Sequence, residues 1–428
     1  MIQGRVLDNL GSQGEAEQAL QEIENLFGTD YLNNQSEKNL LSMLWNRKDR
    51  LSTVELFIIG KCILKIKEED ESWLKKTVRE IKRSPDKTKG LFSEIIYFGM
   101  LSLPYSKITP AARKNPGYDF SITMKNSFTQ FISIKNVDVS DEQKKFQAGC
   151  KRIRAKWKER LRFFHKNLGL TVISKEPIKE SDFELIIKSI KEVKKIFPQL
   201  RITARDGLDM LITRLPINYE VSPIHTSDMV LIYCPSPESE KKRYANKVAL
   251  AAKNLISHTK QEINALRIIF IRVNVHADYT RIQNRAIQII NDPTSKIDCI
   301  MTYQPSYVRD NEGNSIIHHC FKLEATQRFA MSLGEDAPAK ITIPLGITSM
   351  SQAPIQFVDP INGKVQEIQS SDYIFQQGDI YKLGKIGEDI YINSPAPGIK
   401  VHGVCEINNQ FIAISSKLTP NEENLILI

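Results

Sequence analysis

The first 88 residues place apolar side chains at three- and four-residue spacing, which is the period of an amphipathic helix. Four segments follow this pattern: residues 16–27, 37–47, 52–66 and 71–83. The polar stretch RSPDKTKG at 83–90 then interrupts the pattern with a proline and a glycine. We therefore predict a helical N-terminal region over residues 1–88.

A different pattern follows this break. It predicts a buried helix, a loop, two alternating strands around the turn KNSF and two further helices, in this order: 91–102, 104–117, 118–124, 129–136, 141–167 and 181–197. Strands and helices then alternate up to about residue 304. This alternation favours an α/β fold with a mixed sheet flanked by helices, and we expect residues 89–330 to form one such domain.

The last part of the chain, residues 335–428, contains short strand-like runs separated by turns such as DPINGK and NSPAPG. Runs of this length between Pro, Gly, Asn and Asp predict a small all-β domain, either a barrel or a sandwich.

Composition agrees with a globular protein of two or three domains, since 428 residues include 41% hydrophobic and 25% charged side chains. No apolar run approaches the roughly 18 residues that cross a bilayer, and the N-terminus lacks the pattern of a signal peptide. We expect a cytoplasmic protein that does not enter a membrane. The six cysteines lie far apart without a CxxC pair, which favours reduced thiols. His318, His319 and Cys320 lie in one predicted strand, where neighbours face opposite sides, so zinc is disfavoured there.

The net charge of +9 is unevenly distributed along the chain. Between Asp141 and Leu170 ten cations face three acids, so this stretch alone carries 10 − 3 = +7. A concentration of cations on one helix is typical of a polyanion-binding surface, although a solvated helix face is an equal alternative. The candidate phosphate-contacting residues are Lys151, Arg152, Arg154, Lys156, Lys158 and Arg162.

The hairpin at 118–136 brings possible catalytic groups together. If the turn is centred on Ser127, the numbers of paired residues sum to 254, and Asp119 lies opposite Lys135. Ser133 has the same parity and shares that face. A shift of the turn by one residue would break this pairing.

A carboxylate beside an amine suits phosphodiester hydrolysis. Asp119 can bind a hard cation such as Mg²⁺ or Mn²⁺, which lowers the pKa of bound water and offsets charge on the phosphate. Lys135 can position or deprotonate the attacking water. Glu94, an acid within the apolar helix LFSEIIYFGMLS, is the candidate for a second metal ligand.

The order of helical Glu94, GYDF and a strand ending in SIKN resembles the core of PD-(D/E)xK nucleases, which are restriction-endonuclease-like. That family has a helical Glu, an Asp opening the second strand, an acidic-x-Lys closing the third strand and then a helix with polar or basic groups. The resemblance covers residues 91–165 and implies that Glu94 and Asp119 hold the metal and that Lys135 is the catalytic lysine. The backbone carbonyl of Ile134 would be a further metal ligand.

The sequence departs from this family at Ser133, which stands where an acid is usual and is our fourth candidate catalytic residue. The resemblance implies a metal-dependent endonuclease in prokaryotic defence or repair, acting on DNA rather than RNA. A homodimer or a protein partner could use the N-terminal or C-terminal region. The first alternative is a non-catalytic nucleic-acid-binding or scaffolding protein on a degenerate nuclease core. The second is an α/β region that binds a nucleotide or small ligand. The motifs of P-loop ATPases, zinc proteases and serine hydrolases are absent from the sequence.

Overall fold

The architecture is described from a computed structural model. It describes the following residues: 5, 10, 12–34, 36, 39–47, 50–101, 107–111, 117–123, 128–164, 168–194, 199–214, 230–274, 277–309, 315–333, 347–349, 355–358, 365–368, 372–376, 382–386, 389–393, 405–407 and 410–412.

The N-terminal region is helical, as the periodicity predicts. The helices are α1 (Gln13–Phe27), α2 (Thr29–Asn33), α3 (Leu40–Asn46) and α4 (Arg50–Arg83). The predicted break between the third and fourth helical segments is a kink in α4 at Asp70, whose φ is −152° and ψ is 79°. The Asp70 carboxylate accepts a hydrogen bond from the backbone N–H of Trp73 at 2.9 Å, which caps the second half of the helix.

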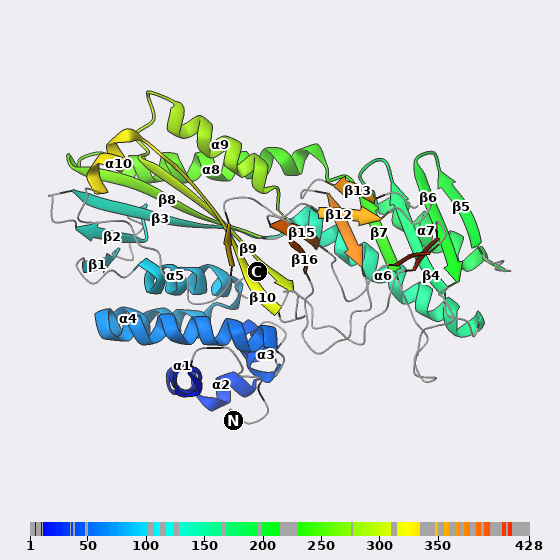
Figure 1. The fold of residues 1–428 in the computed structure, drawn as a ribbon, viewed down its shortest axis with the longest axis horizontal. Coiled ribbons are helices and arrows are strands. Elements are labelled where there is room, and N and C mark those ends of the chain that lie inside the picture. The colour runs from blue at the N-terminus through cyan, green and yellow to red at the C-terminus, as the bar shows by residue number, and fades with distance from the viewer. Residues whose placement is uncertain are drawn as a thin grey trace.

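A seven-stranded mixed sheet forms the centre of the fold (Figure 1). Its order is β1 (Lys107–Pro110), β2 (Phe120–Thr123), β3 (Thr129–Val137), β8 (Ala265–Val273), β9 (Cys299–Arg309), β10 (Ser315–Ala325) and β11 (Ile347–Ser349). β1, β2 and β3 are antiparallel neighbours, whereas β3, β8 and β9 run parallel. β1 lies within the segment predicted as a loop. That prediction was wrong for these residues, because β1 pairs with all four residues of β2.

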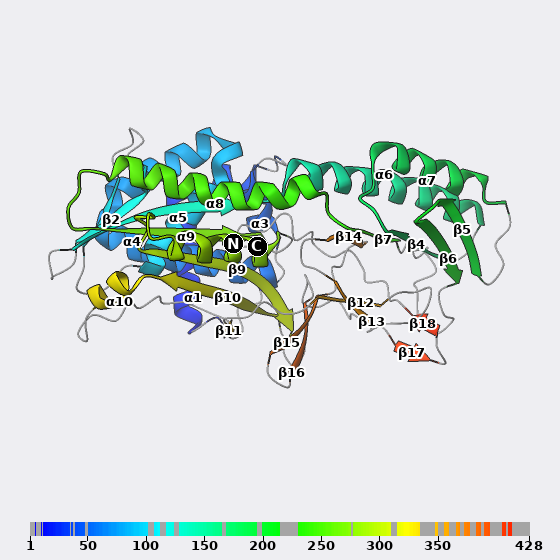
Figure 2. The ribbon, with the colours of Figure 1, turned by 90° about the horizontal axis from the view of Figure 1, so that it is seen from above.

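Helices cover both faces of this sheet (Figures 1 and 2). On one face α5 (Thr88–Leu101) packs against β3, in a core that includes Ile132 and Ile134, and α4 reaches β2 through the ring of Trp73, 5.7 Å from that of Phe120. On the other face α8 (Glu238–His258) packs against β3 and α9 (Tyr279–Asn291) against β9 and β10, in a core that includes Phe131 and Val137. Because side chains alternate along a strand, Ser133 and Lys135 belong to the α8 face.

Residues 89–330 contribute four strands to a second sheet, which the sequence did not separate from the first, and its fifth strand comes from later in the chain. Its order is β14 (Tyr373–Gln376), β7 (Val230–Cys234), β4 (Leu168–Ser174), β6 (Leu208–Arg214) and β5 (Gln199–Arg205). The chain leaves the first sheet after β3, forms α6 (Asp141–Phe164) and α7 (Glu180–Glu192) with the second sheet, and returns through α8. Figure 1 shows the two sheets at opposite ends of the molecule, with α8 extending from the first towards the second.

Strands also occur beyond residue 335, but those that the structure describes do not close into a barrel. β11 pairs with β10 of the first sheet, and β14 pairs with β7 of the second. The others form hairpins: β12 (Ile355–Val358) with β13 (Val365–Ile368), β15 (Lys382–Ile386) with β16 (Asp389–Asn393), and β17 (Cys405–Ile407) with β18 (Gln410–Ile412). The division at residue 335 stays a prediction, and two of these strands complete sheets built by earlier residues.

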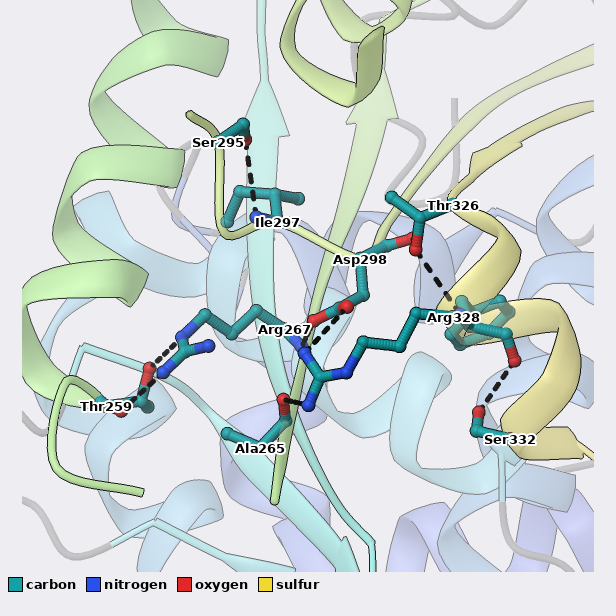
Figure 3. Close-up of polar contacts among 10 residues, drawn as sticks. Thr259, Ala265, Arg267, Ser295, Ile297, Asp298, Thr326, Arg328 and Ser332 are labelled. Atoms are coloured by element: carbon teal, nitrogen blue, oxygen red, sulfur yellow. Dashed lines mark hydrogen bonds and ion pairs between the residues drawn. The ribbon is translucent and has the colours of Figure 1, made fainter. Parts of the chain in front are cut away.

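A polar network fixes the amino-terminal ends of β8 and β9 (Figure 3). The Asp298 carboxylate accepts from the backbone N–H of Arg267 at 2.8 Å and from Arg328 Nη1 at 3.1 Å. Arg328, in α10 (Gln327–Leu333), also donates to the carbonyl of Ala265 at 3.0 Å. The network therefore ties α10 to the start of β8. Among the described residues, no helix has the length and apolar character needed to span a bilayer.

Candidate active site at the end of strand β3

The β2–β3 hairpin positions the predicted acid and lysine, but its register differs from the prediction. Phe120 pairs with Ile132 and Thr123 with Thr129, so the numbers of paired residues sum to 252 rather than 254. Extending this register by one residue places Asp119 opposite Ser133, and Lys135 becomes its diagonal neighbour. The predicted direct pairing of Asp119 with Lys135 was therefore wrong. The observed and predicted sums differ by two, an even number, so each residue stays on its predicted face. Asp119, Ser133 and Lys135 therefore still share one face of the hairpin.

The segment before β2 is held by packing and by backbone hydrogen bonds. Gly117 has a positive φ of 77°, and a Cβ there would lie 2.5 Å from the ring of His258 in α8, so only glycine fits. The ring of Tyr118 packs edge-on against Phe131, with centroids 4.9 Å apart. The backbone N–H of Asp119 donates to the carbonyl of Ile132 at 2.8 Å. These contacts fix the backbone from which the Asp119 side chain projects.

The Asp119 carboxylate lies where β2 and β3 separate, and it is half-buried. Its Oδ2 accepts a hydrogen bond from the backbone N–H of Ile134 at 2.5 Å. Its Oδ1 accepts none from the residues that the structure describes. Burial raises the pKa of Asp119 above its ordinary value, although the charge of Lys135 and the Ile134 N–H act to lower it. This carboxylate is thus desolvated, close to a cation and only partly hydrogen-bonded.

Ser133 and Lys135 lie on β3 beside this carboxylate. Lys135 is half-buried, and its charge acts on Asp119. Ser133 is fully buried, and its hydroxyl has no hydrogen-bond partner among the residues that the structure describes. A buried hydroxyl without a partner costs about 1–3 kcal/mol of desolvation, so Ser133 does not serve stability through a hydrogen bond in this arrangement.

Glu94 does not join this group. Two contacts fix α5 along β3: Lys89 Nζ lies 4.0 Å from Asp138 Oδ1, and the rings of Phe98 and Phe120 are 5.2 Å apart. Glu94 lies between these points on the helix and is half-buried. However, α5 covers the face opposite Ser133 and Lys135, and within the described parts of the chain neither Asp119 nor Lys135 is a polar partner of Glu94. The structure therefore places Asp119, Ser133 and Lys135 on one face of the sheet and Glu94 on the helix that covers the other face, and the role of Glu94 as a metal ligand stays a prediction.

The residues near Asp119 form a sparse set of metal ligands. The described residues contain no group of three His, Cys, Asp or Glu side chains that could hold a metal ion. Mg²⁺, however, usually retains several water molecules and is bound through one or two carboxylates together with the phosphates of its substrate. A desolvated carboxylate with Oδ1 available fits this minimal mode. The side chain of Ile134 packs in the core, so only its backbone carbonyl could contribute, and that role stays a prediction.

The basic helix α6 belongs to the second sheet. Ile153, Trp157 and Leu161 are fully buried against this sheet, which orients the predicted cations outwards. Arg152 and Lys156 form ion pairs with other described residues. Arg152 pairs with Glu180 at 2.5 Å and with Glu184 at 2.9 Å, and Lys156 pairs with Glu159 at 2.5 Å.

The other four predicted phosphate-contacting residues differ in their surroundings. Lys151, Lys158 and Arg162 are exposed and Arg154 is half-buried. Burial lowers the pKa of Lys158, and the like charges of Arg154 and Arg162 lower it further. Arg154, Lys158 and Arg162 recur at four-residue spacing, so they form one row along the helix.

Sequence reasoning missed a polar cluster at the carboxyl ends of β3 and β8. Arg272 is 3% exposed, and its Nη1 donates to Asn136 Oδ1 at 2.6 Å and lies 3.4 Å from Asp138 Oδ1. Asn136 Nδ2 in turn donates to Asp138 Oδ2 at 2.6 Å. The arginine within the apolar run RIIFIRV was the available signal, because a buried guanidinium requires polar partners.

His319 and Cys320 face opposite sides of β10, as predicted, and so do not form a zinc site together. His319 Nδ1 lies 2.9 Å from the hydroxyl of Tyr303, whereas Cys320 packs on the α8 face with Tyr279. The side chain of His318 lies outside the described residues. Cys62, Cys150, Cys234, Cys299 and Cys320 are free thiols, which agrees with the expectation from their spacing.

Comparison of the whole chain with protein-family models, with curated proteins and with solved structures found no match.

Proposed function

We propose that this protein is a metal-dependent nuclease of the PD-(D/E)xK type that hydrolyses DNA, with Asp119 and Lys135 at its centre. One observation carries the proposal: a desolvated carboxylate lies where two strands separate, and the charge of a lysine at the diagonal position of the next strand acts on it. Such a pair can bind a divalent cation and a phosphate together. A lysine–carboxylate pair that served only stability would not require the carboxylate to be desolvated, so the burial of Asp119 favours a functional role.

The order of the strands supports the proposal. β1 precedes β2 in an antiparallel arrangement, so Asp119 comes directly before the second strand and Lys135 lies near the end of the third. These are the positions of the family's acid and lysine. The helix that follows differs from the family pattern, because α6 joins the second sheet and α8 covers the face of Ser133 and Lys135.

The chain's own residues would act as follows. Asp119 Oδ1 would hold the metal ion, with the carbonyl of Ile134 as an additional ligand. A bound Mg²⁺ or Mn²⁺ ion would supply an activated water and offset charge on the phosphate. Ile134 N–H keeps the Asp119 carboxylate in one orientation by binding Oδ2. Lys135 would orient the attacking water and neutralise the developing charge with its ammonium group.

Ser133 favours a second candidate, a nucleic-acid-binding protein that has lost catalysis. A buried, uncharged hydroxyl stands where the family has an acid, so the centre has one carboxylate fewer. The exposed cations of α6 would then account for the whole function, by binding phosphates without cutting.

Cleavage and binding assays on the same protein separate the two candidates. The full chain is incubated with supercoiled plasmid, single-stranded DNA or RNA in Mg²⁺ or Mn²⁺, beside Asp119→Asn and Lys135→Ala. Matched controls are Asp206→Asn and Lys76→Ala, which remove the same charges at exposed positions.

The nuclease proposal predicts cutting of DNA by the parent and the controls, and a loss of about 100-fold or more in the two site variants. Equal cutting by all five proteins would refute the assignment of the centre. Salt-sensitive binding by all five without cutting would favour the second candidate.

A further inference from the structure

The solvent-facing side of α6 carries an aromatic ring as well as positive charge. The opposite side of the helix is buried against the second sheet through Ile153, Trp157 and Leu161, and Figure 2 shows α6 beside α7 over one face of that sheet. The second half of the helix presents a row of cations and, at the end of this row, a phenylalanine. None of these residues belongs to the hydrophobic core of the second sheet.

The row consists of Arg154, Lys158 and Arg162, each four residues from the next. Four residues advance a helix by about 6 Å, and side chains at this spacing are neighbours. Burial lowers the pKa of Lys158, and the like charges of Arg154 and Arg162 lower it further. Like charges at this spacing destabilise a helix, so the row favours a polyanionic partner that neutralises it.

The phenylalanine at the end of the row is Phe163, which directly follows Arg162 and is 66% exposed. Every other Phe, Tyr or Trp side chain whose burial the structure describes is buried or half-buried. The ring therefore lies on the surface next to a cation, although the protein buries its aromatic side chains elsewhere.

Arg160 holds the Phe163 ring in place. Its guanidinium carbon lies 4.6 Å from the ring centroid, within the range of a cation–π contact. Arg160 Nη2 also donates to the carbonyl of Val193, the residue that ends α7, so the guanidinium is anchored to the neighbouring helix. A ring that is fixed from one side and largely exposed to solvent has the properties of a platform on which a base can stack.

We propose that this side of α6 binds a single strand of nucleic acid, with its phosphates on Arg154, Lys158 and Arg162 and a base stacked on Phe163. The charge of the row is complementary to phosphate, and its short steps suit the close spacing of phosphates along one strand. A duplex keeps its bases paired and stacked inside, so it could use the cations but not the ring. This inference rests on the nucleic-acid-binding surface of the proposed function and names its partner, but it does not depend on cutting.

Binding of labelled oligonucleotides to the full chain tests the inference, in a metal chelator so that metal-dependent cutting does not interfere. The probes are oligo(dT), oligo(U) and a DNA duplex of the same length. We expect at least one of the two single strands to bind about fivefold or more tightly than the duplex at about 0.1 M salt, because only a single strand gains the stacking energy. The tighter of the two strands shows whether DNA or RNA is the partner. Equal or tighter binding of the duplex, or no binding of any probe, would overturn the proposal.

Variants of Phe163 test the stacking contact. Phe163→Ala should weaken single-strand binding about fivefold or more and leave duplex binding unchanged, whereas Phe163→Trp should retain single-strand binding. The matched control is Ile263→Ala, which removes an apolar side chain that is 92% exposed and lies in the turn before β8. Single-strand binding that Phe163→Ala leaves unchanged, or that Ile263→Ala weakens equally, would contradict the role of the ring.

A double variant tests the cation row. Lys158→Gln with Arg162→Gln should lower the dependence of log K on log salt concentration by about 1.4 and weaken single-strand binding about 10-fold or more at about 0.1 M salt. The control, Lys76→Gln with Lys253→Gln, removes two exposed cations from α4 and α8 and should change neither quantity. An unchanged salt dependence in the double variant would place the binding surface elsewhere and overturn the proposal.

The outcomes also separate this inference from the proposed nuclease activity. A protein that cuts plasmid DNA in Mg²⁺ but shows no preference for a single strand would refute this inference alone. A protein that binds as described here but does not cut would refute only the catalytic proposal.

Discussion

Removal of the Asp298 carboxylate should destabilise the first sheet more than any other single change in the network of Figure 3. Its side chain is 5% exposed and accepts from the Arg267 backbone N–H at 2.8 Å and from Arg328 Nη1 at 3.1 Å. Asp298→Ala leaves the backbone N–H of Arg267 without its acceptor, and Arg267 is itself only 5% exposed. A buried donor left without its acceptor costs about 1–3 kcal/mol, and the pair with the 44% exposed Arg328 adds at most about 1 kcal/mol, so we expect a loss of about 2–4 kcal/mol.

Asp298→Asn and Arg328→Ala set the scale for this loss. Asparagine keeps an oxygen for the Arg267 N–H and loses only the attraction to Arg328, whose side chain is 44% exposed. Each of these variants should therefore lose about 1 kcal/mol. Urea unfolding measures the free energy of unfolding of each of the three variants. We expect the dependence of this free energy on urea concentration, the m value, to be the same for all three. An Asp298→Ala protein within about 1 kcal/mol of the parent would refute the assignment of this network as a buried anchor.

Three further outcomes follow from other parts of the structure. Burial raises the pKa of Asp119 in the folded protein, so the folded state holds the proton of this carboxyl group more tightly than the unfolded state. The contribution of this group to the free energy of unfolding is therefore greatest below its unfolded pKa, and it is lost as pH rises through its folded pKa. Without metal, Asp119→Asn should therefore have a higher Tm than the parent at about pH 8, and the difference should shrink towards pH 4; a constant difference would contradict this. Ser133→Ala should raise the free energy of unfolding by about 1 kcal/mol, because it removes a buried hydroxyl without a partner; a loss in urea unfolding would show that the hydroxyl is bonded. Gly99→Ala should lower Tm, since its Cβ would lie 2.5 Å from Cys62 Cβ and overpacking costs about 1–3 kcal/mol, whereas Gly14→Ala, with open space around it, should not.

The helices and the central hairpin could be predicted because their hydrophobic patterns are local. The apolar period of residues 1–88 depends only on neighbouring residues, and even the kink of α4 at Asp70 falls at the predicted break. β1 was missed because KITP is a four-residue edge strand, too short to alternate visibly, and it forms only through its pairing with β2. Pairing between strands is not visible in a local pattern.

The register of the hairpin shows why the site was predicted only in part. Parity alone places Asp119, Ser133 and Lys135 on one face, and this depends on the two-residue period of a strand. The exact partner depends on the turn, which lies between β2 and β3 and which the sequence KNSF did not specify. The position of Glu94 depends on which face of the sheet α5 covers, and this is a tertiary property.

The second sheet could not be separated from the first because its strands have the same apolar character. DMVLIYC of β7 and RIIFIRV of β8 are both short buried strands, yet they belong to different sheets. The basic helix α6 likewise has a clear apolar face, but the sequence does not state that Trp157 packs against β4 and its neighbours rather than against β3. Chain connections of this kind are decided by long-range packing.

The role of Asp119 in holding the metal is measured most directly by the rate at which the protein cuts DNA in a single turnover, with and without the Asp119 carboxylate. We expect the parent to cut supercoiled DNA only when Mg²⁺ or Mn²⁺ is present, Asp206→Asn to cut at the parental rate, and Asp119→Asn to be at least about 100-fold slower while still binding the DNA. Cutting by Asp119→Asn at the parental rate would show that this carboxylate does not hold the metal, and cutting by the parent in a metal chelator would show that no metal is needed.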